Sequence, residues 1–336
     1  MLTLRLASLT VAMLAAHGIA INSARPSHTR GETGRPVVLV VHGRGQFGRD
    51  SAQIRRDALH ALQNGANALM GTSLLEESDV RLVWYADLLD ARSRGSAPLC
   101  AHTDSLEQDA SLASEPNAVS VLAGLLGALL DAASSDSTDD ETLDARRLGG
   151  DLHYLADPAT RCAARQRVSS ALRDAAREGR PVILVAHSFG SFVAWDHLRL
   201  RTARGGVSLP EVHRFITVGS PLGSTELRQL VFGEDSVALT LPTAVDAWTN
   251  VLAAGDPFAS RITERDSTGA TVRRSASILD VSTQGDQDDP HLLVSYLHDT
   301  TTARVVLSAW CDAYVKRPRA ADASCASLTA ASRSEP

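Results

Sequence analysis

The stretch RPVILVAHSFGSFVAWDHL, residues 180–198, contains the pattern that decides the fold class. Its first half is a short apolar run rich in β-branched residues, which ends at His187 and Ser188. Its second half is an amphipathic segment that begins after Gly190. Uninterrupted apolar runs of this length are typical of strands buried on both faces of a parallel sheet. The stretch therefore predicts a buried strand, a tight turn and a helix, in that order.

A second run of the same kind, VVLVV, starts after Arg35 and Pro36 and ends before His42 and Gly43. Four more stretches have strand character: VRLVWYA (80–86), RFITVG (214–219), AWTNVLAA (247–254) and SILDVST (277–283). Helical patterns occupy intervals at 53–69, 161–179 and 301–315. This alternation predicts an α/β fold with a doubly wound, mostly parallel sheet. In such sheets the functional residues follow the carboxyl ends of the strands.

The region 88–158 interrupts this alternation and is interpreted as an insertion. It contains an apolar segment, VSVLAGLLGALLDAA at 119–133, and an acidic loop at 131–141. The apolar segment is nearly hydrophobic all round. That pattern fits a lid-like helical segment over an apolar pocket, a contact with a membrane surface, or a helix buried against the sheet. The acidic loop has the composition of a solvated connector.

Residues 1–20 have the composition of a secretory signal peptide. Arg5 precedes the apolar run LASLTVAMLAA, and the small residues Gly18 and Ala20 suit a signal-peptidase site. We therefore expect a secreted or periplasmic protein; an over-extended gene start, or a buried first strand in a cytoplasmic protein, is the alternative. The other expected divisions are a flexible lead-in at 21–35, one domain at 36–316 and a C-terminal tail at 317–336.

The chain has 336 residues, and 44% of them are hydrophobic. This number of apolar residues is enough to form a sizeable core. Charged residues make up 21% and the formal net charge is −6, without basic blocks of the kind that follow a phosphate backbone. A nucleic-acid partner is therefore not expected. No G-x-x-x-x-G-K motif follows a strand candidate, which disfavours a P-loop nucleotide enzyme. GRGQFG at 43–48 has the G-x-G-x-x-G spacing after the run VVLVV, but such a match alone is weak evidence for a dinucleotide or redox enzyme.

The four cysteines fit an exported protein. Cys311 and Cys325 flank a short C-terminal stretch and could close a loop, while Cys100 and Cys162 bracket the middle of the chain. Connectivity cannot be read from the spacing alone, and neither pair has the spacing of metal ligands. Structural thiols or disulfides are expected, and no metal site.

Ser188 has the neighbours that an exposed nucleophile on a strand-to-helix turn requires. The pattern small-x-Ser-x-small is met by Ala186 and Gly190, because bulky residues at these two ends would collide across the turn. The backbone N–H of Phe189 would lie at the helix N-terminus, where it can face a developing oxyanion. The alternative is a polar residue in an ordinary turn, but the position between a buried strand and a helix favours a nucleophile.

Five motifs carry a resemblance to a known family: VVHGRGQ, VAHSFGS, FITVGSPLGS, WTNVLAAGDPFA and DPHLLVSYL. Together they resemble the alpha/beta-hydrolase superfamily, in particular its bacterial lipase-like and esterase-like serine hydrolases. The resemblance covers residues 36 to about 316 and implies an alpha/beta-hydrolase domain with an insertion at about 88–158. It also implies a nucleophile, an acid and a base in the chain order Ser, Asp, His.

The same resemblance implies roles for the loop that ends the first strong strand. Members of the family place a backbone N–H just after the His-Gly dipeptide, which is Arg44 here, and this N–H would complete an oxyanion hole with Phe189. His42 is expected to brace the loop. His187, although it precedes the nucleophile, is expected to point away from it.

The base is expected to be a neutral imidazole. The chain order that the resemblance implies places it after the last strand candidate, where His291 fits better than His298. His298 is expected on a short helix. The acid has to follow the penultimate strand and hold the imidazole tautomer, which selects Asp256. Asp246 precedes that strand, and Asp280 lies inside the last one.

These residues lead us to expect a serine hydrolase that cleaves carboxylic esters through an acyl-enzyme, without a metal or an organic cofactor. The expected substrate is a small-molecule or lipid ester, with a possible membrane-surface contact through 119–133. Thioesterases and acyltransferases use the same groups and remain alternatives. A non-catalytic envelope or lipid-surface binding protein that retains the fold is the alternative from a different class.

Overall fold

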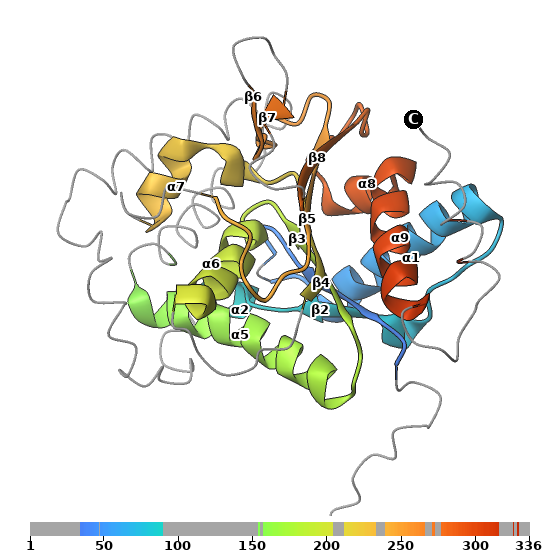
Figure 1. Ribbon diagram of the computed structural model, residues 1–336, viewed down its shortest axis with the longest axis horizontal. Helices are drawn as coiled ribbons and strands as arrows, with labels where there is room; N and C mark the ends of the chain where they lie inside the picture. The colour runs from blue at the N-terminus through green and yellow to red at the C-terminus, as the bar shows by residue number, and fades with distance from the viewer. Residues whose placement is uncertain are drawn as a thin grey trace, which may run out of the picture. The chain divides into compact units, whose positions relative to one another are not determined.

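The computed structural model describes residues 34–46, 48–89, 154, 157–203, 212–232, 239–265, 271–272, 277–315, 325 and 328. These residues contain a six-stranded sheet whose strands are all parallel, in the order β2-β1-β3-β4-β5-β8. Helices cover both faces of the sheet (Figure 1). The expected α/β class with a parallel sheet is therefore confirmed.

The sheet strands agree closely with the apolar runs of the sequence. They are β1 (Val37–Val41), β2 (Val80–Val83), β3 (Val182–His187), β4 (Val212–Val218), β5 (Trp248–Ala253) and β8 (Ile278–Thr283). A separate antiparallel pair consists of β6 (Glu264–Arg265) and β7 (Thr271–Val272).

The strand β1 shows why an uninterrupted apolar run forms the centre of such a sheet. Val37, Leu39 and Val41 pack into the core on one face, whereas Val38 and Val40 pack into the core on the other face. Every residue of β1 and of β3 is buried. Because both faces are covered, these strands are apolar along their length, and the one polar residue in them, His187, stands at the carboxyl end of β3.

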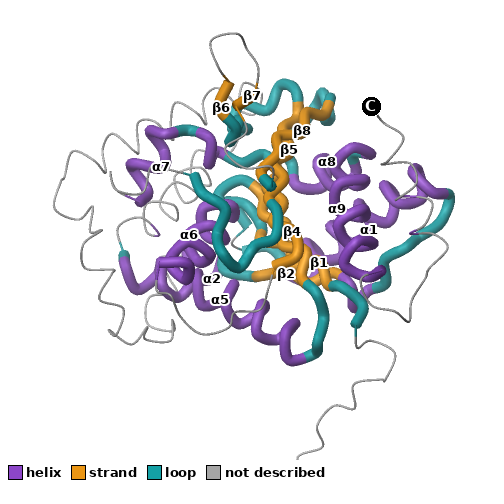
Figure 2. Tube along the Cα trace, viewed as in Figure 1, coloured by secondary structure: helices purple, strands orange, loops and turns teal. Residues whose placement is uncertain are grey.

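The helices form two layers, one on each face of the sheet (Figure 2). One layer contains α2 (Ala86–Leu89), α5 (Pro158–Arg177), α6 (Gly190–Ala203) and α7 (Thr225–Phe232). The other contains α1 (Ser51–Met70), α8 (Leu293–His298) and α9 (Thr300–Val315). Two single turns of 3-10 helix are η1 (Glu77–Asp79) and η5 (Pro221–Gly223). The three helical patterns of the sequence correspond to α1, α5 and α9.

The strand β2 ends earlier than its sequence pattern predicts. The apolar run continues through Trp84 and Tyr85, but the strand stops at Val83. Tyr85 instead bonds to the loop after β1: its hydroxyl donates to the His42 carbonyl at 2.8 Å, and its N–H donates to His42 Nε2 at 3.3 Å. These contacts redirect the chain away from the sheet and into α2.

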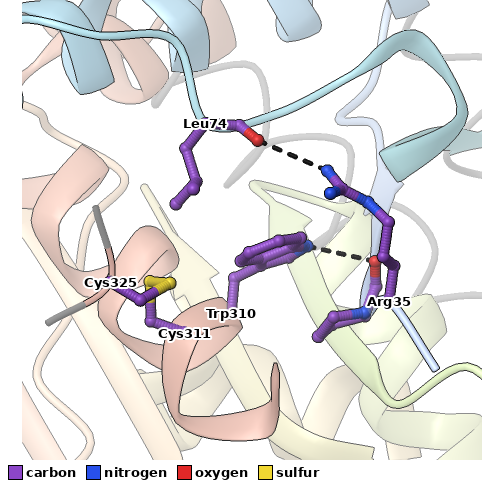
Figure 3. The surroundings of a disulfide bond; sticks show 6 residues. Arg35, Leu74, Trp310, Cys311 and Cys325 are labelled. Carbon is purple, nitrogen blue, oxygen red and sulfur yellow. Dashed lines mark hydrogen bonds between the residues drawn. A yellow bond between two sulfur atoms is a disulfide. The ribbon is translucent and has the colours of Figure 1, made fainter. Parts of the chain in front are cut away.

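The repeated Arg-Pro before two strands has a structural explanation. Arg180 and Arg35 bind the two oxygens of the buried Asp79 carboxylate at 2.6 and 2.5 Å. Asp79 directly precedes β2, so the three residues join the amino ends of β1, β2 and β3. Nearby, the Trp310 indole donates to the carbonyl of Pro36 at 3.0 Å (Figure 3). This end of the sheet lies opposite the end where functional residues are expected.

The cysteine pair at the C-terminal end is a disulfide, as the sequence suggested. Cys311 on α9 and Cys325 form the bond, and both residues are buried (Figure 3). Cys162 is also disulfide-bonded. Its suggested partner, Cys100, lies outside the described residues.

Several expectations concern segments that the structure does not describe. The signal peptide at 1–20, most of the lead-in at 21–35, the segment 119–133 and the acidic loop at 131–141 lie outside the described residues. Of the tail at 317–336, only Cys325 and Leu328 are described, and both are buried. Within the described part of the chain, no helix combines the length and the apolar character that a membrane span needs.

Candidate active site

The turn between β3 and α6 holds Ser188 in an unusual backbone conformation. Ser188 has a φ of 50°, and it is the one non-glycine residue with positive φ in the described part of the chain. Its N–H donates to the Val218 carbonyl of β4 at 3.1 Å, which fixes the turn against the neighbouring strand. Left-handed backbone at a residue other than glycine costs free energy and is found preferentially at functional sites.

The small residues around Ser188 are required by the packing of this turn. A Cβ on Gly190 would come within 2.3 Å of the His42 carbonyl oxygen and 2.7 Å of the Val41 carbonyl oxygen. Ala186 lies fully buried in β3, opposite Val41 of β1. The steric reason for the small-x-Ser-x-small pattern therefore applies to Gly190 directly.

Gly190→Ala is expected to destabilise the protein by about 1–3 kcal/mol, the usual cost of overpacking a filled site. The clash is with backbone atoms of the segment after β1, which cannot rotate away as a side chain could. Urea denaturation of the variant and the wild type measures the difference. An unchanged free energy of unfolding would contradict this expectation and show that the turn can accommodate a Cβ at position 190.

Ser188, His291 and Asp256 come together although they lie far apart in the sequence. His291 Nε2 lies 2.9 Å from Ser188 Oγ, and His291 Nδ1 lies 3.0 Å from both carboxylate oxygens of Asp256. Asp256 follows β5, and His291 lies between β8 and α8. An ionised carboxylate only accepts hydrogen bonds, so Nδ1 carries the proton and Nε2 is left to accept the Ser188 hydroxyl proton.

The alternative candidates for the base and the acid have other positions and other contacts. His298 is the last residue of α8 and is exposed. Asp246 lies before β5, where its carboxylate is 3.1 Å from the His213 ring. Asp280 lies within β8 and accepts from the Asn250 side chain at 2.8 Å. The structure thus brings His291 and Asp256 to Ser188 and none of the three rivals.

The Asp256 carboxylate is held by two donors besides His291. The Phe258 N–H donates to Oδ1 at 2.8 Å, and the Tyr296 hydroxyl donates to Oδ2 at 2.6 Å. Burial acts to raise the pKa of Asp256. The hydrogen bond and charge of His291, followed by the bonds from Tyr296 and Phe258, outweigh it and hold that pKa below its ordinary value. Asp256 is therefore ionised at neutral pH.

Two further histidines lie beside the site in roles other than that of a base. Burial and the neighbouring charge of His291 lower the pKa of His187 to about 3, and its Nε2 lies 2.7 Å from the His291 carbonyl oxygen. Burial lowers the pKa of His42 to about 4 against the opposing effect of its bond to the Gly43 carbonyl. A general base works best with a pKa near the operating pH, so neither ring suits that task.

The two proposed oxyanion donors belong to segments that meet at Ser188. A Cβ on Gly43 would lie 3.0 Å from the Ser188 Cβ, so the loop that carries Gly43 and Arg44 packs directly on the turn. Phe189 precedes α6, and its carbonyl accepts from the Phe192 N–H at 3.0 Å. The N–H groups at the start of a helix lack intrahelical partners and point outward from its first turn.

Two residues of the site were missed by the sequence analysis. Gly219 has a φ of 56°, and a Cβ there would lie 2.9 Å from Asp256 Oδ2 and 3.2 Å from His291 Nδ1. Only glycine allows the chain after β4 to pass this close to the acid and the base. Tyr296 lies in the DPHLLVSYL motif, but nothing in a single sequence indicates that its hydroxyl reaches Asp256.

The sequence also does not indicate the hydrogen bonds by which Ser191, Ser220 and Ser260 connect the segments around Ser188. Ser191 Oγ lies 2.6 Å from the Ser188 carbonyl oxygen, to which it donates, and 2.7 Å from Ser220 Oγ. Ser260 in turn donates its N–H to the Ser220 carbonyl at 2.9 Å. These bonds connect the turn at Ser188 with the loop after β4 and with the loop that contains Asp256.

Comparisons of the chain with protein-family models, with curated proteins and with solved structures found no match. The geometry of Ser188, His291 and Asp256 is therefore the basis of any functional proposal. In the part of the chain that the structure describes, no group of three or more His, Cys, Asp or Glu residues is placed to hold a metal ion.

Proposed function

We propose that this protein is a serine hydrolase that cleaves carboxylic esters, built on an alpha/beta-hydrolase fold. The observation that carries the proposal is the continuous pair of contacts at the site: 2.9 Å from Ser188 Oγ to His291 Nε2, and 3.0 Å from His291 Nδ1 to Asp256. The positive φ of Ser188 supports the proposal, because strained backbone at a residue other than glycine is found preferentially at functional sites. In this proposal the insertion at about 88–158 carries the lid-like helical segment.

The contacts of His291 with Ser188 and Asp256 support an acyl-enzyme mechanism in which one imidazole carries the proton transfers. His291 Nε2 takes the Ser188 proton as Oγ attacks the ester carbonyl, and the carbonyl oxygen becomes an oxyanion. The imidazolium then gives this proton to the departing alcohol oxygen as the C–O bond breaks, which leaves an acyl group on Ser188. A water molecule then attacks the acyl carbon while His291 Nε2 takes its proton. The bond between the acyl carbon and Oγ breaks, the imidazolium returns the proton to Oγ, and the carboxylic acid leaves. Asp256 holds the ring and stabilises its charged form throughout.

The backbone N–H groups of Arg44 and Phe189 are proposed to bind the oxyanion. Each such donor lowers the barrier by about 3 kcal/mol, because its dipole is fixed before charge develops. The packing of Gly43 on Ser188 supports this assignment for the loop of Arg44.

Asp256→Asn is expected to lower kcat for p-nitrophenyl ester hydrolysis by about 10⁴-fold. The amide can present an N–H to Nδ1 and so favour the tautomer whose Nε2 carries a proton and cannot accept the serine proton. Asp246→Asn is the matched control, because Asp246 is a half-exposed carboxylate near another histidine and is expected to retain full activity. Equal activity of the two variants would contradict the role given to Asp256.

A series of p-nitrophenyl esters with increasing acyl length tests the substrate class. Turnover of short and long esters supports the proposal, whereas turnover of thioesters alone would indicate a thioesterase. Added primary alcohol that diverts the acyl group into a new ester would indicate an acyltransferase. A protein that turns over none of them fits the non-catalytic alternative, which the strained Ser188 argues against.

The proposed location is outside the cytoplasm, in the periplasm or the medium. The buried Cys311–Cys325 disulfide supports it, because such bonds persist in oxidising compartments.

A further inference from the structure

The hydroxyl of Tyr296 makes a direct contact with the acid of the site. Tyr296 lies on α8 and is 1% exposed. Its hydroxyl donates to Asp256 Oδ2 at 2.6 Å and accepts the N–H of Ala253, at the end of β5, at 3.0 Å. The proton of the hydroxyl is therefore directed at the carboxylate, because the backbone N–H occupies its acceptor side.

This bond gives each oxygen of the Asp256 carboxylate one hydrogen-bond donor besides His291. Oδ1 has the Phe258 N–H as a second donor, and Oδ2 has the Tyr296 hydroxyl. With one fixed donor on each oxygen, the carboxylate plane cannot rotate, and both oxygens stay 3.0 Å from His291 Nδ1. Without the hydroxyl, Oδ2 would keep His291 Nδ1 as its single side-chain donor among the described residues.

We propose that Tyr296 is a positioning residue for the ester hydrolysis proposed above, acting through Asp256 to fix the orientation of the His291 ring. The inference rests on the proposed function for its kinetic consequences. Its structural consequence, a fixed bond between Asp256 and His291, is independent of the substrate.

The charges around the hydroxyl are compatible with this role. Burial, and then the negative charge of Asp256, raise the pKa of Tyr296 above its ordinary value, so the phenol stays protonated as a donor. The other titratable ring packed against Tyr296 is His187, whose centroid lies 6.2 Å away and whose pKa of about 3 keeps it neutral. Asp256 is therefore the group whose pKa the hydroxyl lowers.

Tyr296→Phe is expected to lower kcat by about 10-fold and to change KM by less than about twofold. The substitution removes a hydrogen bond to a charged group but removes no contact with the substrate. Loss of the Tyr296 donor raises the pKa of Asp256, because that hydrogen bond lowers it in the wild type. The carboxylate is then protonated, and stops fixing the His291 ring, at a higher pH than in the wild type, so activity is expected to be lost earlier as the pH falls.

Tyr154→Phe is the matched control, because it also removes a buried hydroxyl that donates to a buried carboxylate, Asp196, at 3.4 Å. It is expected to leave the pH profile in place. A proton NMR comparison of the downfield His291 Nδ1–H signal, which needs no substrate, is expected to show faster exchange with water in Tyr296→Phe alone.

The outcomes separate the inference from the proposed function. A Tyr296→Phe variant with the wild-type pH profile and the wild-type NMR signal overturns the positioning role, even if it unfolds at a lower temperature. Absence of ester turnover in the wild type contradicts the proposed function instead, and the NMR comparison then still decides whether Tyr296 fixes the bond between Asp256 and His291.

Discussion

Ser188→Ala is expected to lower kcat for ester hydrolysis by about a million-fold, to the level of binding and oxyanion stabilisation alone. The loss is this large because the serine oxygen forms the covalent bond, and among the described residues Ser188 is the hydroxyl that His291 Nε2 contacts, at 2.9 Å. Alanine is similar to serine in volume and in backbone preference, so the variant is expected to fold. Steady-state hydrolysis of p-nitrophenyl esters measures the effect.

Ser224→Ala serves as the control for the serine substitution. Its hydroxyl accepts the Leu227 N–H at the start of α7 and donates to Glu226, and its loss is expected to leave kcat unchanged. Circular dichroism and thermal unfolding check that both variants fold. If Ser188→Ala retained more than about one percent of the wild-type kcat, the nucleophile would have to be another group.

His291→Ala is expected to reduce kcat by a similar factor, about a million-fold, because nucleophile and base act as one unit. Without the imidazole, the Ser188 hydroxyl has to attack as a neutral and weak nucleophile. The expected loss appears in kcat, whereas KM changes little, because the ring makes its main contribution in the transition state.

His298→Ala is the matched control for the base, since both histidines lie in or next to α8. His298 is exposed at the end of that helix, and its removal is expected to leave activity intact. A result in which His298→Ala is inactive and His291→Ala is active would reverse the assignment of the base.

The sequence allowed the central strands and the main site residues to be predicted for specific physical reasons. The runs before His42 and His187 are buried on both faces and consist of apolar residues alone, so their pattern is unambiguous. Ser188 was predicted as the nucleophile because its turn restricts the size of two neighbours, and the contact that a Cβ on Gly190 would make with the His42 carbonyl shows that restriction directly. Local sterics of this kind are readable from a few adjacent residues.

The remainder of the site depends on contacts between residues far apart in the sequence. Tyr296 and Asp256 are separated by 40 residues, and Tyr85 and His42 by 43. Tyrosine is a common core residue, and its sequence neighbours do not indicate which polar atom its hydroxyl reaches. Tyr85 was assigned to a strand for this reason, although its bonds to His42 take it out of the sheet.

The most direct test of the central claim is covalent labelling with a fluorophosphonate, followed by mass spectrometry of the labelled peptide. We predict that the wild-type protein is labelled on Ser188, that His291→Ala reacts far more slowly, and that Ser188→Ala does not react. A well-folded wild type that takes up no probe, or labelling of Ser188→Ala equal to that of the wild type, would contradict the assignment of Ser188 as the nucleophile.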